Sequence, residues 1–551
     1  MDSQSIRSVF ASLLLPALLA SCGSGGSSAP PAPPPPVPPP AATFDTQYLV
    51  SATSPFSANC DGVAADGTLF RNAEVEPYLA INPLNGNQLI GVWQQDRWSN
   101  GSSRGLMTGV SNDGGHTWVR RPMPFSRCGG GTAGNGGDYA RATDPWVSFG
   151  PDGVAYQIAL ATIGTSMQPG SVNAVLASRS IDGGVSWSDP VTLIRDGADF
   201  FNDKETITAD PTDARYVYAV WDRLPLAGGG PAFFARSSNG GVSWEPARAI
   251  VDPGVKSQTI GNVIAVLPNG VLVNLFNQIN TAGNGSTSAF LAVVRSMDKG
   301  LTWSAPVRIA DLLSIGARDP ETNAAIRDGA LLPQIAVARS GSLFVVWQDA
   351  RFNAGLRDAV ALSRSDDAGL TWTAPVRVNG DTSVQAFIPT VHVRADGQIG
   401  VTYYDLRSNT SNRATLPTDY WLARSDNGTN WSERRVAGPF DLDFAPVARG
   451  LFLGDYQALG SIGNLFVPFF VQTSAVGDLD NRTDVFAAPQ TTVAATASGQ
   501  LHIERAAQDE FVPSPQVRQK VSDNLLESLE RRLPGWRGEV QRRRDAATAG
   551  K

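Results

Sequence analysis

Acidic, basic and phenolic side chains recur at two positions of a strand pair that is repeated along the chain. The starts of the first strands supply Glu76, Asp144, Asp203, Lys204, Glu205, Asp455 and Tyr456. The ends of the second strands supply Asp96, Arg97, Asp222, Arg223, Asp349, Arg351, Asp405 and Arg407. Carboxyl groups serve as general acids and bases, and guanidinium groups hold anionic ligands. This set of side chains suits the hydrolysis of glycosidic bonds.

Histidine is nearly absent, which narrows the chemistry further. The three histidines are His116, His392 and His502, and none has a partner at a spacing typical of catalysis or metal binding. The sequence therefore argues against a Ser-His-Asp triad and a His-ligated metal, and it predicts no cofactor. Carboxylates gathered at one mouth are also the ligands that Ca²⁺ prefers, so a structural Ca²⁺ stays open. The formal net charge of −7 argues against a nucleic-acid partner.

An eight-residue motif indicates which elements position these side chains. It reads SNDGGHTW over Ser111–Trp118 and recurs at 180–187, 237–244, 296–303 and 365–372, with a shorter copy at 425–431. Its Asp or Asn accepts hydrogen bonds from nearby backbone N–H groups, its Gly takes a positive φ, and its Trp packs under the turn. Six of the 13 tryptophans lie in these copies, which indicates a repeat fold.

Seven strand pairs precede or accompany these motifs. They lie at 76–97, 144–161, 203–223, 262–278, 333–351, 388–407 and 455–473. The last pair is followed by RTDVFAA at 482–488, a third strand, and the segment near 46–53 could supply its fourth. The sequence therefore predicts an all-β propeller of seven four-stranded blades closed by the N-terminal strand, with six blades as the alternative.

Blade geometry predicts where a site would form. In such a blade the start of the first strand and the end of the second lie on one face, and the eight-residue turns lie on the other. The charged side chains named above should therefore meet around one mouth, where Tyr139, Trp98 and Trp146 offer flat apolar surfaces. The alternative is that about half of the Asp–Arg pairs only hold neighbouring blades together.

The eight-residue motif resembles the Asp box of the sialidase superfamily, and the resemblance covers roughly residues 70–490. It implies a β-propeller and an exo-α-sialidase-like glycoside hydrolase. The GDYQAL element, Gly454–Leu459, is similar to the family's nucleophile element and implies Tyr456 as nucleophile with Glu205 as its partner. The implied acid/base is Asp144 or Asp96, and the implied substrate-binding residues are Arg223, Arg351, Arg407, Arg97 and Glu76.

One position departs from that family. Its first strand pair begins with an arginine in an R-I-P motif, and this chain has Val75-Glu76-Pro77 there. The sequence therefore leaves two alternatives beside the hydrolase: a non-catalytic propeller that binds glycans or surface proteins, and a polysaccharide lyase. The expected partner in every case is a glycan or glycoconjugate.

The N-terminal segment predicts export. Residues 1–21 combine Arg7 with an apolar stretch and end in Leu19-Ala20-Ser21, which resembles a bacterial lipoprotein signal cut before Cys22. Acylated Cys22 and the Gly-, Ser- and Pro-rich residues 22–43 would form a lipid anchor and tether, the only expected contact with a membrane. The expected location is the bacterial cell envelope.

The remaining features concern the body and the tail. The propeller is expected at 44–490 as a monomer, and Cys60 and Cys128 are expected to form a disulfide in an oxidising compartment. The tail, 491–551, carries a charged helical stretch at 514–547, with Ser514 as N-cap, Pro515 at the first helical position and a modest stripe of leucines. We expect a short, solvated helical appendage that is packed on the propeller or partly disordered.

Overall fold

Alternating runs of β-branched and polar residues fold into antiparallel strands throughout the chain. The computed structural model describes residues 46–64, 67–226, 228–283, 285–474, 482–491, 501–503 and 511–532. The described residues all belong to one compact unit. The predicted signal peptide, Cys22 and the tether lie outside the described residues, as do residues 492–500, 504–510 and 533–551 of the tail.

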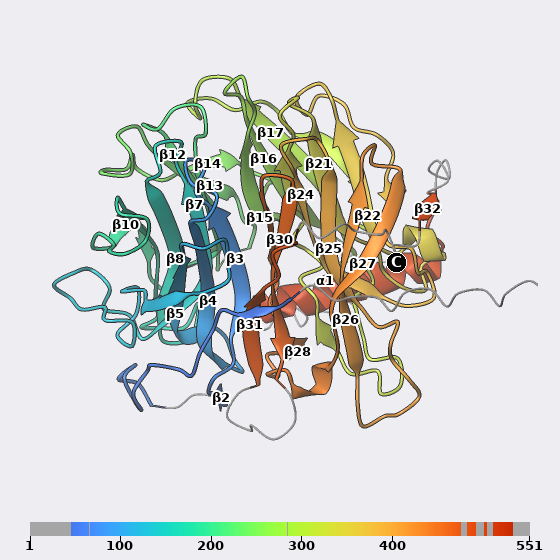
Figure 1. Cartoon of the computed structure of the whole chain (residues 1–551), viewed down its shortest axis with the longest axis horizontal. Coiled ribbons are helices and arrows are strands. Elements are labelled where there is room, and N and C mark those ends of the chain that lie inside the picture. The colour runs from blue at the N-terminus through green and yellow to red at the C-terminus, as the bar shows by residue number, and fades with distance from the viewer. Residues whose placement is uncertain are drawn as a thin grey trace, which may run out of the picture. The chain divides into compact units, whose positions relative to one another are not determined.

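The first three four-stranded blades follow one another along the chain (Figure 1). Each blade is given from its inner to its outer strand. The first blade consists of β3 (Val75–Ile81), β4 (Leu89–Trp98), β5 (Ser103–Ser111) and β6 (Val119–Pro122), and the second of β7 (Arg141–Phe149), β8 (Ala155–Ile163), β9 (Val172–Ser180) and β10 (Val191–Asp196). The third consists of β11 (Phe200–Ala209), β12 (Val217–Pro225), β13 (Ala232–Ser237) and β14 (Arg248–Val251). The pairing of Ser103 with Ala142 joins the first two blades.

Three further blades complete most of the ring. The fourth blade consists of β15 (Ser257–Val266), β16 (Leu272–Thr281), β17 (Thr287–Ser296) and β18 (Val307–Asp311), and the fifth of β20 (Gln334–Val337), β21 (Leu343–Asp349), β22 (Ala359–Ser365) and β23 (Val376–Arg377). The sixth consists of β24 (Ala386–Val393), β25 (Ile399–Asp405), β26 (Pro417–Ser425) and β27 (Asn430–Asp441), and β32 (Leu501–Ile503) pairs with β27. Short elements between blades are β2 (Leu69–Phe70), β19 (Ile326–Arg327), β28 (Leu451–Phe452) and the 3-10 helices Ala350–Asn353 and Leu442–Phe444.

The seventh blade joins the two ends of the propeller. It consists of β29 (Ala458–Ile462), β30 (Leu465–Thr473), β31 (Thr483–Ala487) and β1 (Tyr48–Leu49). Tyr48 pairs with Ala487 and Leu49 with Phe486, so the N-terminal strand closes the ring as the sequence predicts. The inner strands contact one another in a complete cycle, β3, β7, β11, β15, β20, β24, β29 and back to β3. The described chain is thus a seven-bladed β-propeller, and the six-bladed alternative is wrong.

The Asp-box turns show the local chemistry that fixes each blade. In the first one, Asp113 Oδ1 accepts hydrogen bonds from the backbone N–H groups of His116 (3.0 Å) and Thr117 (2.9 Å) and from the Ser111 hydroxyl (2.8 Å). Trp118 is buried under the turn, and its Nε1 donates to the Gly115 carbonyl at 3.0 Å. These contacts explain why the motif recurs without contributing to a site.

A β-bulge recurs at the start of five inner strands. The pairing register shifts by one residue in β3, β7, β11, β15 and β24. In each shift one residue takes a positive φ, and these residues are Glu76 (54°), Asp144 (53°), Lys204 (55°), Gly261 (69°) and Ile388 (51°). A left-handed residue in a bulge redirects a side chain out of the strand's alternation. Three adjacent blades therefore present Glu76, Asp144 and Lys204 from equivalent backbone positions.

The C-terminal helix α1 (Pro515–Arg532) packs on the propeller. It begins as predicted: Ser514 Oγ accepts a hydrogen bond from the Val517 backbone N–H at 3.3 Å. Its buried apolar stripe consists of Val517, Val521, Leu525, Leu526 and Leu529. Nothing among the described helices is both long and apolar enough to cross a bilayer.

Two glycines make room for α1 on the propeller. A Cβ on Gly355 would lie 2.2 Å from a Val517 side-chain atom, and one on Gly316 would lie 2.6 Å from Asn524. Larger residues would push the helix away from this surface. The described helix is therefore packed on the propeller, which is one of the two arrangements expected for the appendage.

Candidate functional site

A cavity of about 270 Å³ opens on the face opposite the Asp boxes. It is lined by the starts of β7 and β11, the ends of β4 and β8, the segment 327–332 and the end of α1. Its charged lining residues are Arg97, Arg141, Asp144, Asp203, Lys204, Arg327, Asp328, Arg449, Asp455 and Arg532. Of the strand-start and strand-end residues named from the sequence, those that line this cavity are Arg97, Asp144, Asp203, Lys204 and Asp455.

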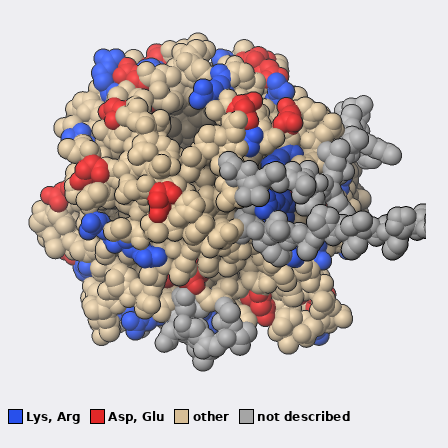
Figure 2. Space-filling view, in the orientation of Figure 1, with Lys and Arg blue, Asp and Glu red and all other residues tan. Residues whose placement is uncertain are grey.

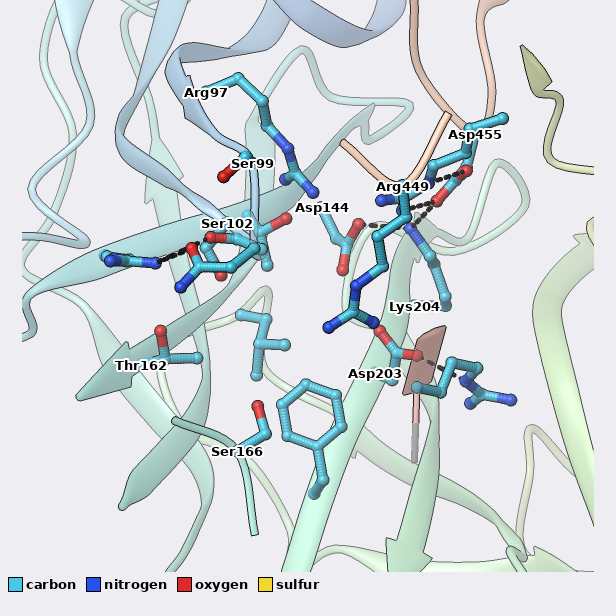
Figure 3. A pocket seen from close by; sticks show the side chains of 18 of the residues that line it. Arg97, Ser99, Ser102, Asp144, Thr162, Ser166, Asp203, Lys204, Arg449 and Asp455 are labelled. Atoms are coloured by element: carbon cyan, nitrogen blue, oxygen red, sulfur yellow. Dashed lines mark hydrogen bonds and ion pairs between the residues drawn. The ribbon is translucent and has the colours of Figure 1, made fainter. Parts of the chain in front are cut away.

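Lys204 lies at the centre of this cluster. Its Nζ lies 2.7 Å from Asp144 Oδ1 and 2.8 Å from Asp455 Oδ2 (Figure 3), and 3.0 Å from Glu76 Oε1. Burial opposes the ammonium charge, but the acidic side chains of Asp144, Asp455 and Glu76 outweigh it and raise the pKa of Lys204 well above its usual value. Lys204 therefore stays protonated and acts as a charged anchor, not as an amine nucleophile.

Asp455 connects the anchor to a second cation. Arg327 donates from Nε to Asp455 Oδ1 at 2.9 Å and makes a second contact with Oδ2. Burial opposes ionisation of Asp455, yet Arg327 and Lys204 hold the pKa of Asp455 well below its usual range. The Arg327 guanidinium also lies 4.1 Å from the ring centre of Phe452.

Arg97 lines the same cavity but, unlike Lys204 and Arg327, contacts no carboxylate among the described residues. Its guanidinium is buried 5.0 Å from the ring centre of Phe452 and donates to Gln94 Oε1 at 2.7 Å. Its Nε has no hydrogen-bond partner, and Arg97 forms no ion pair, among the described residues. Burial and the neighbouring Arg327 lower the pKa of Arg97 to about 10. Among the described residues no carboxylate forms an ion pair with this buried cation, while Glu76, Asp144 and Asp455 act on it from a greater distance.

Glu76 and Asp144 have opposite protonation preferences. Burial raises the pKa of Glu76 to about 8, although Lys204 opposes this effect. For Asp144, burial is outweighed by Lys204 and by a hydrogen bond from Glu76, so the pKa of Asp144 is lowered. Near neutral pH the pair therefore holds one proton, mainly on Glu76, and Asp144 presents its carboxylate to the cavity.

The two residues implied as a catalytic pair lie behind this cluster. The Tyr456 hydroxyl donates to the Pro145 carbonyl at 3.0 Å, and its ring contacts Trp146 with 5.2 Å between centroids. Both Glu205 carboxyl oxygens are buried without a partner among the described residues. Burial, then the nearby carboxylates, raise the pKa of Tyr456 well above its usual value. Neither residue lines the cavity, and no hydrogen bond joins them.

Four other predicted residues are engaged in the blades. Asp96 accepts from the Ser54 hydroxyl at 2.8 Å, which holds the N-terminal segment. Arg223 pairs with Asp196 at 2.7 Å, Arg351 with Asp349 at 2.8 Å, and Arg407 with Asp405 at 2.6 Å. None of Asp96, Arg223, Arg351 and Arg407 lines the cavity. Only the Arg223–Asp196 pair joins two neighbouring blades, as the structural alternative expects, whereas Arg351–Asp349 and Arg407–Asp405 are contacts within one blade.

Helix α1 contributes a cation to the mouth. Arg532 donates from Nε to Asp203 Oδ2 at 2.7 Å and from NH1 to Gln258 Oε1 at 3.0 Å, and its NH2 lies 3.3 Å from Asp222 Oδ2. Ser528, one turn earlier, also lines the cavity. The tail therefore forms one wall of the site.

The opposite wall carries four hydroxyls beside one charge. Ser99, Ser102, Thr162 and Ser166 line it, as does Arg141, which pairs with Thr162 in the sheet. These four hydroxyl-bearing residues lie across the cavity from Arg449 and Asp203 (Figure 3). On the molecular face seen in Figure 2, acidic and basic side chains are interspersed around a hollow and do not form a patch of one sign. No cluster of three or more His, Cys, Asp or Glu that could hold a metal occurs among the described residues.

Sequence reasoning located some of these side chains and gave no role to others. Glu76, Asp144 and Arg97 were expected from the blade pattern, and Lys204, Asp203 and Asp455 lie at strand starts that the pattern identifies. The excess of acids around a single Lys204 is the signal that could have assigned its role. Arg327, Arg449 and Arg532 lie in connecting loops and in the tail, where no repeat points to them.

The comparisons with known proteins give distant likenesses. No family model matches the chain. An α-L-arabinanase from Penicillium chrysogenum is 16% identical, over 66% of this chain and 94% of that one, with a TM-score of 0.42. A protein of unknown function from Dyadobacter fermentans is 14% identical over 66% of this chain and 95% of that one, with a TM-score of 0.40. A Hadza microbial sialidase is 18% identical over 61% of this chain and 64% of that one, with a TM-score of 0.39.

Proposed function

We propose that the chain is a carbohydrate-active protein that binds an anionic glycan in this cavity and hydrolyses its glycosidic bond. The observation that carries the proposal is the pair of carboxyl groups of Glu76 and Asp144, which lie 3.0 and 2.7 Å from Lys204 Nζ beside the cavity that Arg97 also lines. Six cationic side chains and four carboxylates line that cavity, so an anionic ligand would balance its charge. The hydroxyls of the opposite wall suit sugar hydroxyl groups.

The proposed chemistry uses the pair as one acid/base unit. The pair gives its proton, through the Asp144 carboxyl, to the glycosidic oxygen as the bond to the anomeric carbon breaks. Water attacks that carbon and returns a proton to the pair. Arg97 binds the anionic group of the sugar, and Lys204 keeps Asp144 in place. This assignment replaces Tyr456 as nucleophile, because its hydroxyl is turned to the Pro145 carbonyl.

A panel of 4-methylumbelliferyl glycosides tests the proposal, with anionic members (N-acetylneuraminide, β-glucuronide) and a neutral one (β-glucoside). We expect turnover of an anionic member only, reduced about 100-fold or more by Asp144→Asn. The exposed carboxylate variant Asp189→Asn is the matched control. Tyr456→Phe should keep most of the activity, whereas its complete loss would restore the tyrosine mechanism.

A second candidate function is binding without turnover. It is favoured by one contact, since Asp144 Oδ1 is already bound by Lys204 Nζ at 2.7 Å. In that case an array of anionic glycans should retain the protein, Arg97→Ala should abolish retention, and no glycoside in the panel should be cleaved.

We also propose that the protein is exported and anchored in the cell envelope by an acylated Cys22. The described part supports this with the expected disulfide: Cys60 and Cys128 are joined, with 4.9 Å between their Cα atoms. Such bonds persist in oxidising compartments. Metabolic labelling with a fatty acid, lost in Cys22→Ala, tests the anchor.

A further inference from the structure

Exposed aliphatic side chains recur at the tips of the Asp-box turns. They flank the Asp or Asn of the motif, and they are Ile181, Val185, Val242, Met297, Leu301 and Leu370. The exposed fraction is 74% for Ile181 and 72% for Met297. Leu84, in the hairpin between β3 and β4, is 69% exposed on the same face. Blades one to five thus present an arc of aliphatic tips.

The polar groups of these turns are satisfied internally. Asp182 Oδ1 accepts from the Ser186 backbone N–H at 2.9 Å and from the Ser180 hydroxyl at 2.7 Å, while Oδ2 accepts from the Ser186 hydroxyl at 2.5 Å. Asp298 and Asp367 make the same contacts in their turns. The carboxylates therefore face the turn, and the aliphatic side chains project beyond it.

The chain enters the propeller on this same face. Strands alternate in direction within the seventh blade, so β1, its outer strand, begins on the Asp-box side. The Tyr48 ring lies 4.7 Å, between centroids, from His116 of the first Asp box. The 47 residues before Tyr48, which contain the expected lipid site at Cys22, therefore join the body beside the aliphatic arc.

The cavity lies at the other end of the same strands. Strand β3 starts with the cluster residue Glu76 and ends at Ile81, next to the hairpin that carries Leu84. A surface held against the Asp-box face would thus leave the cavity open to the opposite side.

We propose that the Asp-box face docks on a lipid surface, with the aliphatic tips in the headgroup region and the cavity facing away from the membrane. Apolar side chains at an interface add binding energy to a lipid anchor, and shallow insertion needs no spanning element. This inference rests on the proposed acylation of Cys22 and is independent of the proposed hydrolysis.

Fluorescence quenching in vesicles tests the orientation. The full lipidated chain is reconstituted into vesicles of phosphatidylethanolamine and phosphatidylglycerol that contain nitroxide-labelled lipid. With Cys60 and Cys128 in a disulfide and Cys22 acylated, a single new cysteine can be labelled with bimane. Ile181→Cys and Leu370→Cys report the Asp-box face. Val255→Cys, which is 81% exposed between β14 and β15 on the cavity side, is the matched control.

We expect the label at 181 and 370 to lose most of its fluorescence and the label at 255 to keep it. Replacing Met297 and Leu301 by Ser should weaken the quenching at 181 while the melting temperature stays unchanged. Equal fluorescence at all three positions would overturn the proposal, and shielding from both lipid and aqueous quenchers would show a protein partner instead. Failure of acylation appears separately, because the protein then does not remain with the vesicles.

Discussion

Arg532, the last residue of α1, donates from Nε to Asp203 Oδ2 at 2.7 Å, although the two residues are 329 positions apart. The same guanidinium lies 3.3 Å from Asp222, and burial raises the pKa of Asp222 to about 8 even though Arg532 opposes it. The tail helix is thus tied to the third blade at the edge of the cavity.

Removing that guanidinium should cost stability. Arg532→Ala leaves Asp203 and Asp222 buried without their cation, and we expect the free energy of unfolding to fall by about 3 kcal/mol. Arg518→Ala, in the exposed first turn of the same helix, should change it by less than about 0.5 kcal/mol. Urea denaturation measures both variants. Equal effects would show that the Arg532 contacts contribute nothing beyond an exposed arginine.

The three carboxylates around Lys204 should make substitutions there non-additive. Lys204→Met leaves Glu76, Asp144 and Asp455 without their shared cation, so we expect a loss of about 3 kcal/mol or more. Adding Asp455→Asn removes one of the repelling charges and should recover part of that loss. Denaturation of both single variants and the double variant gives the coupling. Strict additivity would contradict the central role of Lys204.

The raised pKa of Glu76 predicts a pH dependence of stability. Its pKa is 4.5 for a free side chain and about 8 in the folded protein, so the folded state binds the proton more tightly between these values. The contribution of Glu76 is fully present below pH 4.5 and is lost as the pH rises through about 8. Melting temperatures at pH 5 and pH 8 should therefore differ less in Glu76→Gln than in the wild type. A larger difference in the variant would reverse the assigned protonation.

A β-branched side chain at the Gly261 bulge should lower the stability of the fold. The φ of Gly261 is +69°, and a Cβ there would lie 3.0 Å from the Leu332 side chain. Gly261→Val should lower the free energy of unfolding by roughly 1–3 kcal/mol, since a positive φ strains such residues. Gly283→Val, in a loop with nothing within 4 Å of the added Cβ, is the control. Thermal unfolding distinguishes the two variants.

The repeat pattern was enough to predict the propeller, its seven blades and its closure by the N-terminal strand. Asp boxes and strand pairs can be recognised from short stretches of sequence. The closure could be predicted because the last strand pair is followed by a third strand at 482–488 but by no fourth, which leaves the segment containing Tyr48 to complete the blade. The site was harder to predict, because a side chain such as Arg223 can line a cavity or pair with Asp196 of the neighbouring blade, and the sequence does not distinguish these outcomes. The tail was harder still, since nothing in 514–532 reveals that Arg532 reaches Asp203.

The recurring bulge gives five inner strands the same backbone turn, whatever the type of side chain at that position. Two of its five copies, Gly261 and Ile388, turn their backbone as Glu76 does yet carry no charge. A family built on this ring could therefore exchange one ligand class for another by changing a few residues at these positions, without altering any strand, turn or blade-to-blade packing.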